Sequence, residues 1–441
     1  MKPDKELKRI HRCLLGSCSE YFKEIGVPVE FAWPAVATCI SAVIGKKYYM
    51  ETVKGVTGLN GFRFIVSGPG SGKSLTIKFV KQVIEQTQYK VPIMPASVTK
   101  SSLVDELAND KSRVMMGLDA ADQLNVGTIL ASEYGVLIGE HVTKDFYHTM
   151  CMLFDGENYT ETRRHMKGET LEIHSPYLNV LAGTPTHHWG TAFPREAWSL
   201  GYASRCDFAF SDVKEADVET FRPIVRDRNA PAEERIHPFI REFAHDLQCL
   251  VTHVIGEAGG LNHKPAQAIT FSPDGWETFL KWYKVSRITT EFKDPWLLDY
   301  NSRRGFRLWR DCAIMCLARA DTDFFISSED VMKVLGIHAE SEEMLIDYLH
   351  RLQSSEDGDT AKSIWAWGCK VCLKTKKPIP YGMFKEYVAG KVDQHKVDKI
   401  IKYLVDVGAF EETKSFIRAD GIKVNMATPV YVANYRWGEY E

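Results

Sequence analysis

The chain contains a glycine-rich segment, Ser67-Gly68-Pro69-Gly70-Ser71-Gly72-Lys73-Ser74, that is typical of one class of fold. An apolar run of strand length, residues 62–66, precedes it, and residues 75–88 follow with apolar side chains at helical spacing. This order of strand, glycine loop and helix brings backbone N–H groups and the positive end of a helix to one place. Glycines lack the Cβ atom that would keep an anion away from the backbone. The stretch therefore predicts a loop that wraps a phosphate chain.

The residues of this loop have distinct expected tasks. Lys73 would reach the β and γ phosphates of a nucleotide, and the Ser74 hydroxyl would ligate Mg2+. The strict Walker A pattern has Gly where this chain has Ser67, yet the part that wraps the phosphates keeps its strand and helix context. The alternative is a glycine-rich turn that binds nothing. We predict ATP and Mg2+ as cofactors, with nucleotide contacts from Gly68, Pro69, Gly70, Ser71, Gly72, Lys73, Ser74 and Leu75.

The composition indicates a soluble globular protein. Its 441 residues, 44% hydrophobic and 26% charged, should form two or three domains of roughly 150 residues each. The net charge of -3 means that any contact with nucleic acid must come from a local basic patch. Ten cysteines scattered through a long chain without a signal peptide predict reduced thiols and a cytoplasmic location.

Two local features favour ordinary core roles. Cys369 and Cys372 form a lone CxxC, and a structural zinc ion needs four ligands, so free thiols are favoured over a metal site. Residues 31–44 are nearly all apolar but fall short of the ~20 residues that span a bilayer, and they contain Pro34. We expect a core helix here and no membrane partner.

The pattern of elements predicts an α/β fold, a P-loop NTPase core with a mainly parallel sheet. Residues 1–54 should form an N-terminal helical collar of two helices separated by Gly26-Val27-Pro28, and residues 55–215 the ATPase core, opening on a loop at 55–61. Residues 216–353 should form an α-helical lid. A polar run at 353–359 predicts a linker, and residues 360–441 predict three helices and a hairpin, which make a winged helix.

A hydrolysing site needs a carboxylate at a strand end next to the phosphates, and two candidates exist. One strand-like run ends at Asp119 and the other at Glu133. We favour Glu133, because a β-branched and apolar run ends there on a carboxylate that could orient the attacking water. Its neighbour Ser132 stands where a magnesium-supporting Asp often sits, so water or Asp119 would complete the metal shell. A plain surface role for Glu133 remains the alternative.

Two further residues follow in the core. A buried strand ends at Thr184, which could sense the γ-phosphate or the attacking water. Arg205 stands just before the next strand, a position that suits an arginine finger reaching the γ-phosphate of a neighbouring subunit. The alternative for Arg205 is a structural salt bridge. On the central helix of the lid, Arg303, Arg307 or Arg310 could contact nucleotide, although a charged helix face is the simpler role for each.

Two basic regions could contact DNA. Alternating residues 159–165 and 169–173 predict a β-hairpin whose tip gathers Arg163, Arg164, His165 and Lys167. This tip could follow a phosphate backbone or could be an ordinary solvated turn. In the winged helix, the third helix and its approach carry Lys391, Lys396, Lys399 and Lys402. Such modules bind DNA or pack on proteins, and the sequence favours neither.

The ordered series of these motifs resembles the helicase-like P-loop domains of phage and mobile-element replication proteins, which often stand beside or are fused to primases. The similarity covers about residues 25–350 and rests on residues 42–47, 68–74, 99–107, 132–133, 154–156 with Arg163 or Arg164, 182–185 and 204–205. The series also resembles hexameric AAA+ helicases, including superfamily 3 and minichromosome maintenance proteins. The resemblance implies a hexameric ring, a hairpin that lines its pore and grips DNA, and a primase or other replication protein as a partner.

The expected function is that of an ATP-dependent DNA helicase or translocase acting on single-stranded or forked DNA. Lys73, Glu133, Thr184 and Arg205 would be its catalytic residues, with Ser74 and Glu133 at the metal. The main alternative is a nucleotide-dependent replication initiator or helicase loader that binds DNA or a partner without unwinding. A third possibility is a degenerate NTPase kept as a scaffold, for which Ser132 is the argument.

Overall fold

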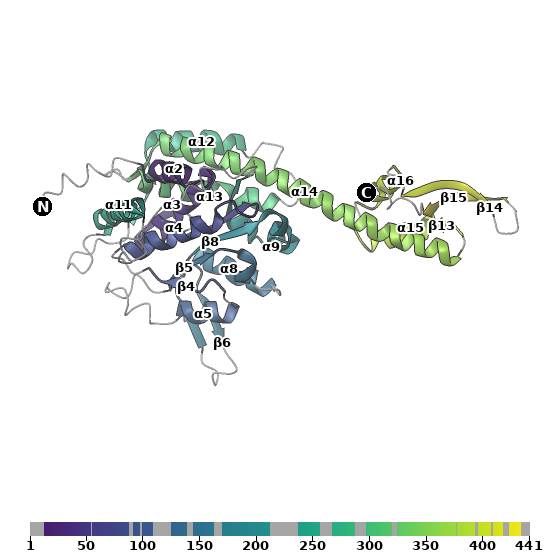
Figure 1. Cartoon of the computed structure of the whole chain (residues 1–441), viewed down its shortest axis with the longest axis horizontal. Coiled ribbons are helices and arrows are strands. Elements are labelled where there is room, and N and C mark those ends of the chain that lie inside the picture. Colours follow the sequence, from purple (N-terminus) through teal and green to yellow (C-terminus); the bar gives the residue numbers. More distant parts are fainter. Residues whose placement is uncertain are drawn as a thin grey trace. The chain divides into compact units, whose positions relative to one another are not determined.

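The computed structural model (Figure 1) describes residues 13–53, 55–87, 91–97, 99–108, 125–138, 144–162, 170–211, 237–255, 267–286, 297–319, 324–375, 377–392, 396–406, 409–417 and 423–433. The chain divides into two compact units, Met1–Leu345 and Ile346–Glu441.

The first unit is built on a five-stranded sheet whose paired strands all run parallel, as the α/β prediction requires. The strand order is β4-β5-β8-β3-β9. β3 and β5 are buried along their whole length, which fits their continuous apolar sequences. The bounds are β3 Phe62–Ser67, β4 Ile93–Met94, β5 Val126–Ala131, β8 Tyr177–Pro185 and β9 Cys206–Ser211.

Helices surround this sheet (Figure 1). Every residue of α3 is buried, and α3 packs against α2, α4, α11 and α13, so the expected core helix is present. By length and composition the segment Val29–Lys47 could also cross a bilayer, but a mostly buried core helix passes the same test. The helices of five or more residues in this part of the chain are α2 Leu14–Glu24, α3 Ala32–Ile44, α4 Lys73–Gln86, α5 Lys100–Ala108, α7 Tyr134–Ile138, α8 Lys144–Asp155, α10 Arg195–Ser199, α11 Pro238–Ile255, α12 Pro273–Ser286, α13 Leu298–Ala318 and α14 Ser328–Thr375.

The first unit also contains smaller sheets. β1 (Tyr48–Thr52) pairs with β2 (Gly55–Gly58) and β10 (Gln267–Ala268), and β11 (Thr270–Phe271) pairs with β12 (Phe325–Ile326). The loop predicted at 55–61 is therefore wrong in its first half, because β2 completes a hairpin with β1. β6 (Tyr159–Thr162) and β7 (Thr170–Ile173) form the predicted antiparallel hairpin strands, beside α5.

The linker predicted at 353–359 is also wrong, because these residues lie within the 48-residue helix α14. Polar composition alone does not end a helix. The run contains no proline, and its one glycine, Gly358, costs only ~1 kcal/mol relative to alanine in a helix interior. The division between the two units lies earlier in the same helix, between Leu345 and Ile346.

The second unit packs the C-terminal part of α14 with α15 (Tyr381–Ala389), α16 (Val397–Asp406) and a three-stranded antiparallel sheet. The strands are β13 (Ile379–Pro380), β14 (Phe410–Ile417) and β15 (Lys423–Ala433), in the order β13-β15-β14. Phe384 anchors the core, with ring centroids 4.7 Å from Phe410 and 4.6 Å from Tyr431. Three helices and a hairpin thus occur where the sequence predicts them, and Cys369 and Cys372 are free.

Candidate functional site

The loop between β3 and α4 is shaped by two glycines in the left-handed region. Gly70 has φ +78° and Gly72 has φ +86°, values that residues with a Cβ atom rarely adopt. A Cβ atom on Gly72 would also lie 3.0 Å from Cγ2 of Val27, in the turn between α2 and α3. The turn between α2 and α3 therefore packs directly on the loop, and glycine at position 72 serves both the backbone conformation and the close contact.

Lys73 begins α4 and folds back onto the loop. Its Nζ donates to the carbonyl oxygens of Ser67 at 2.8 Å and Gly68 at 2.5 Å, and lies 3.3 Å from Oγ of Ser71. Burial lowers the pKa of the Lys73 ammonium from its usual range, while the charge of Glu133 acts to raise it. The protein thus holds a largely desolvated cation among neutral oxygens, beside the N–H groups of the first helical turn, which have no intrahelical partner.

The carboxyl end of β8 lies next to this lysine. Thr184 is 1% exposed and is in register with Val66, one residue before the loop. A Cβ atom on the preceding Gly183 would come within 2.5 Å of the Ser132 carbonyl oxygen and 3.4 Å of Cβ of Lys73. The ends of β3, β5 and β8 therefore converge at the start of α4, where ligands of open α/β sheets commonly bind.

Glu133 follows directly on Ser132, is exposed, and acts electrostatically on Lys73. Ser74 and Leu75 are exposed on the first turn of α4. The structure thus gathers Lys73, Ser74, Glu133 and Thr184 of the sequence-predicted site around one loop. Asp119, the other acidic candidate, lies outside the described residues.

Arg205 lies at the other end of the sheet. Its neighbour Cys206 is in register with Phe62, the first residue of β3, about 17 Å from the level of Ser67 for a rise of ~3.3 Å per residue. The guanidinium donates to the Asp155 carboxylate at 2.5 Å and to the Gly201 carbonyl oxygen at 2.6 Å, and Arg303 shares Asp155 at 3.1 Å. Within the chain, Arg205 therefore has the structural salt bridge weighed above. A role toward a neighbouring subunit stays a prediction.

The arginines of α13 are also bound on the amino side of the sheet. Arg307 donates to the Cys206 carbonyl oxygen at 3.0 Å and to the Tyr300 hydroxyl at 2.6 Å. Arg310 donates to the Gly58 carbonyl oxygen at 3.3 Å and lies 4.3 Å from the centroid of the Phe154 ring. These contacts, with that of Arg303, give each of the three arginines a partner away from the glycine loop.

The predicted DNA-binding tip, Arg163, Arg164, His165 and Lys167, lies outside the described residues. Its base is tied to the core by Lys100, at the start of α5. The Nζ atom of Lys100 lies 2.6 Å from Asp145 of α8 and 3.7 Å from Glu161 of β6. The hairpin strands are thus joined to two helices of the core through one lysine.

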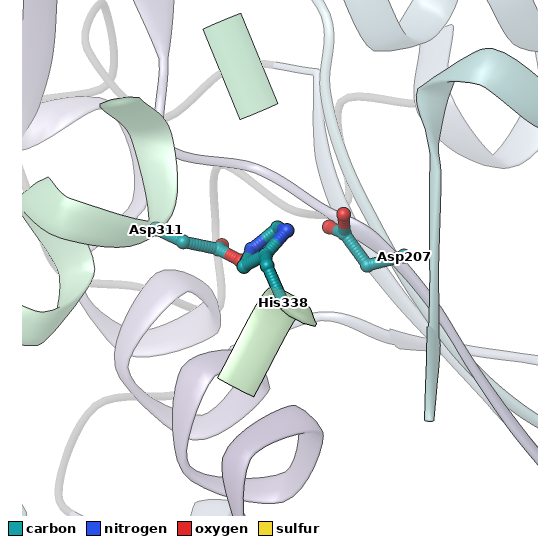
Figure 2. A group of neighbouring side chains, drawn as sticks. All are labelled: Asp207, Asp311 and His338. Atoms are coloured by element: carbon teal, nitrogen blue, oxygen red, sulfur yellow. The ribbon is translucent and has the colours of Figure 1, made fainter. Parts of the chain in front are cut away.

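Sequence reasoning missed a buried charged cluster that Figure 2 shows, in which His338 lies between Asp207 and Asp311. Nε2 of His338 is 2.7 Å from Oδ2 of Asp311, and the Trp33 indole N–H donates to the same oxygen at 3.3 Å. Burial, then the charge of Asp311, raises the pKa of Asp207. Burial also acts to raise the pKa of Asp311, but the hydrogen bond and charge of His338 hold it below its usual range. No spacing of residues in the sequence predicts this cluster, because its members come from three separate elements, β9, α13 and α14.

The three ligand atoms lie within 4.8 Å of one another, close enough to hold a metal ion. Two nearby arginines, however, disfavour a metal ion at this position. Nε of Arg307 is 2.9 Å from Oδ1 of Asp207, and Nη2 of Arg63 is 3.7 Å from Oδ1 of Asp311. Both carboxylates are therefore already neutralised, and a divalent cation would meet two buried positive charges.

Comparison with known proteins identifies no family for this chain: no family model matches it, and no curated protein matches it.

We predict that Gly183→Ala lowers the free energy of unfolding by ~1–3 kcal/mol, because its methyl group would overlap the backbone of Ser132. Gly135→Ala is the matched control, since its methyl group meets nothing within 4 Å. Urea denaturation of both variants measures the difference. Equal stabilities would contradict the close approach of β5 and β8.

We also predict that Arg205→Ala lowers the free energy of unfolding by about 3 kcal/mol, because it leaves Asp155 with one of its two cations. Arg303→Ala, which removes the more exposed arginine, should cost only ~0–1 kcal/mol. A larger loss for Arg303→Ala in the same assay would overturn the anchoring role of Arg205.

Proposed function

We propose that the chain is an ATPase whose nucleotide site is the loop from Gly68 to Leu75. The observation that carries this proposal is Lys73, whose buried ammonium is held by oxygens of the loop at the carboxyl edge of a parallel sheet. An anion would relieve the desolvation of this charge better than neutral carbonyls do. The left-handed glycines and the exposed first turn of α4 leave room for phosphates to approach the backbone.

In this mechanism each residue has a local task. Lys73 leaves the carbonyls of Ser67 and Gly68 to bind the β and γ phosphates, and Ser74 supplies a hydroxyl ligand for the metal. Bound Mg2+ would supply neutralisation of phosphate charge. Glu133, exposed to solvent and close enough to act on Lys73, orients the attacking water. Thr184, buried on the adjacent strand, reports whether the γ-phosphate is present.

We further propose that ATP hydrolysis drives a ring of identical subunits, a hexamer by the resemblance above, along single-stranded or forked DNA. The support is the hairpin of β6 and β7, inserted between β5 and β8 and tied to α5 and α8 by Lys100. This connection joins α5 and α8 to β6, the strand that precedes the basic tip in the sequence. A primase or another replication protein would be a partner, and the location would be cytoplasmic.

The alternative proposal is a replication initiator or helicase loader, and the second unit favours it. This unit has its own core, and α16 exposes Lys399 and Lys402 on the side away from its buried Ile400 and Leu404. A module of this form could recognise DNA or a protein while ATP sets only assembly. The two proposals differ in strand displacement, since a loader hydrolyses ATP without unwinding a forked duplex.

We predict that Lys73→Ala reduces ATP hydrolysis to background, since it removes the phosphate-binding charge. Glu133→Gln should retain bound ATP and slow turnover by roughly 10²-fold or more, because the carboxylate acting on water is lost. Lys78→Ala, an exposed lysine of the same helix, is the control and should keep activity. Phosphate release and nucleotide retention measure both effects. Turnover of Glu133→Gln near the wild-type rate would transfer the catalytic role to Asp119.

For the motor, we predict that Arg164→Ala combined with Lys167→Ala keeps basal hydrolysis but loses its stimulation by single-stranded DNA. Because phosphate contacts are removed, the salt dependence of DNA binding should also fall, by ~0.7 in slope per contact. The control pairs Lys281→Ala with Lys333→Ala, two solvent-facing lysines of the lid helices. Unchanged DNA affinity and forked-duplex unwinding would remove the hairpin from the mechanism and favour the loader.

A further inference from the structure

The first unit contains a cavity of about 360 Å³ between the helical collar, the edge strand β9 and the lid helices. This volume lies within the ~300–1,000 Å³ typical of small-molecule sites. Its walls are largely apolar and partly aromatic, and include Leu15, Val29, Trp33, Phe208, Phe210 and Met344. The cavity is separate from the glycine loop, and the proposed ATPase mechanism does not use it.

Four of the charged residues that line the cavity form two pairs of opposite charge, and His338 lies between the two aspartates. Asp207 pairs with Arg307, and Asp311 pairs with Arg63, and all four residues line the cavity. Arg63 and Asp311 are each 1% exposed. Nη2 of Arg63 and Oδ1 of Asp311 face each other at 3.7 Å, too far for a hydrogen bond, and neither they nor Nε of Arg63 has a hydrogen-bond partner among the described residues. Each such group costs ~1–3 kcal/mol when left unpaired. Buried donors and acceptors side by side point to a molecule that supplies both in return.

The charges limit the class of that molecule. A metal ion would meet Arg63 and Arg307, as argued above. A phosphate would meet Asp207 and the exposed carboxylates of Glu30 and Glu340, opposed there by Lys23. The complementary ligand is therefore uncharged overall, with a flat apolar body for the aromatic walls and an acceptor next to a donor on its edge. Nucleobases have this combination.

We propose that this cavity binds a nucleobase as a free nucleoside, a ligand without the phosphates that the glycine loop would take. Its edge would face Arg63 and the two aspartates, and small side-chain adjustments would bring the atoms of Arg63 and Asp311 that lack hydrogen bonds into contact with it. Trp33 and Phe208 would flank the ring.

Two short stretches of chain connect the cavity to the glycine loop, so the bound nucleoside would act on the ATPase site. On one side Val29 lines the cavity, two residues after Val27, which packs on Gly72. On the other side Phe210 lines the cavity next to Ser211, whose carbonyl oxygen accepts from Oγ of Ser67 at 2.5 Å. This regulatory step rests on the proposed ATPase function, whereas nucleoside binding does not.

The test is isothermal titration of the full chain with adenosine, guanosine, cytidine and uridine, and with ATP. At least one nucleoside should bind, and Ala209→Phe, which fills the cavity from β9, should weaken that binding at least tenfold. Ala339→Phe, an exposed position outside the cavity lining, should leave it unchanged. Asp207→Asn provides a second variant, smaller in its change of shape, that should also weaken nucleoside binding.

The variant Lys73→Ala separates this inference from the proposed function. It should lose ATP binding and keep nucleoside binding. If Lys73→Ala binds ATP normally, the ATPase proposal fails and the nucleoside site stands. Absence of binding by all four nucleosides, or binding that Ala209→Phe leaves intact, would overturn the nucleoside site.

Discussion

The parallel pairing of β3 with β8 on one side and β9 on the other is the constraint on which the rest of the first unit depends. Six register pairs join β3 to each neighbour, from Phe62 to Ser67. Because the strands are parallel, their carboxyl ends meet at one edge of the sheet and their amino ends at the other. The glycine loop therefore lies at the carboxyl edge of the sheet, and Arg63 with its ion-pair partner lies at the amino edge.

At the carboxyl edge, backbone segments pack closely against one another. β8 inserts between β3 and β5, so Gly183 must pass the Ser132 carbonyl and the Lys73 side chain without a Cβ atom. This approach leaves Thr184 and Glu133 beside one desolvated ammonium. The lysine is restrained by neutral oxygens, which stabilise its charge less than an anion would. In the proposed ATP site, phosphate would replace the neutral oxygens and stabilise the Lys73 charge more strongly.

At the amino edge the chemistry is that of buried ion pairs. Arg63 of β3 meets Asp311 of α13, Arg307 of α13 meets Asp207 of β9, and Asp155 takes both Arg205 and Arg303. Buried pairs of this kind add little net stability, since desolvation offsets their attraction, but losing one partner is costly. They therefore fix how the lid helices sit on the sheet, and they explain why the lid arginines are directed away from the glycine loop.

The sequence by itself determined the local elements and the loop. Continuous apolar runs predicted the buried strands and the core helix α3, helical spacing predicted α16, and the glycines with Lys73 predicted the loop between β3 and α4. These signals are local, because backbone conformation and burial period are set within a few residues. The same local logic failed at 353–359, where a polar run was compatible with a helix as well as with a linker.

Only the tertiary structure decided which charged residues meet. Arg205 could have been free or paired from its sequence position, and the answer came from Asp155, 50 residues away in the chain. The cluster of Asp207, Asp311 and His338 is assembled from three elements, so no spacing could reveal it. Ion pairing depends on the distance between side chains in space and on the burial that strengthens it. The order of residues gives neither the distance between two side chains nor their burial, because both depend on how the folded sheet and helices are arranged.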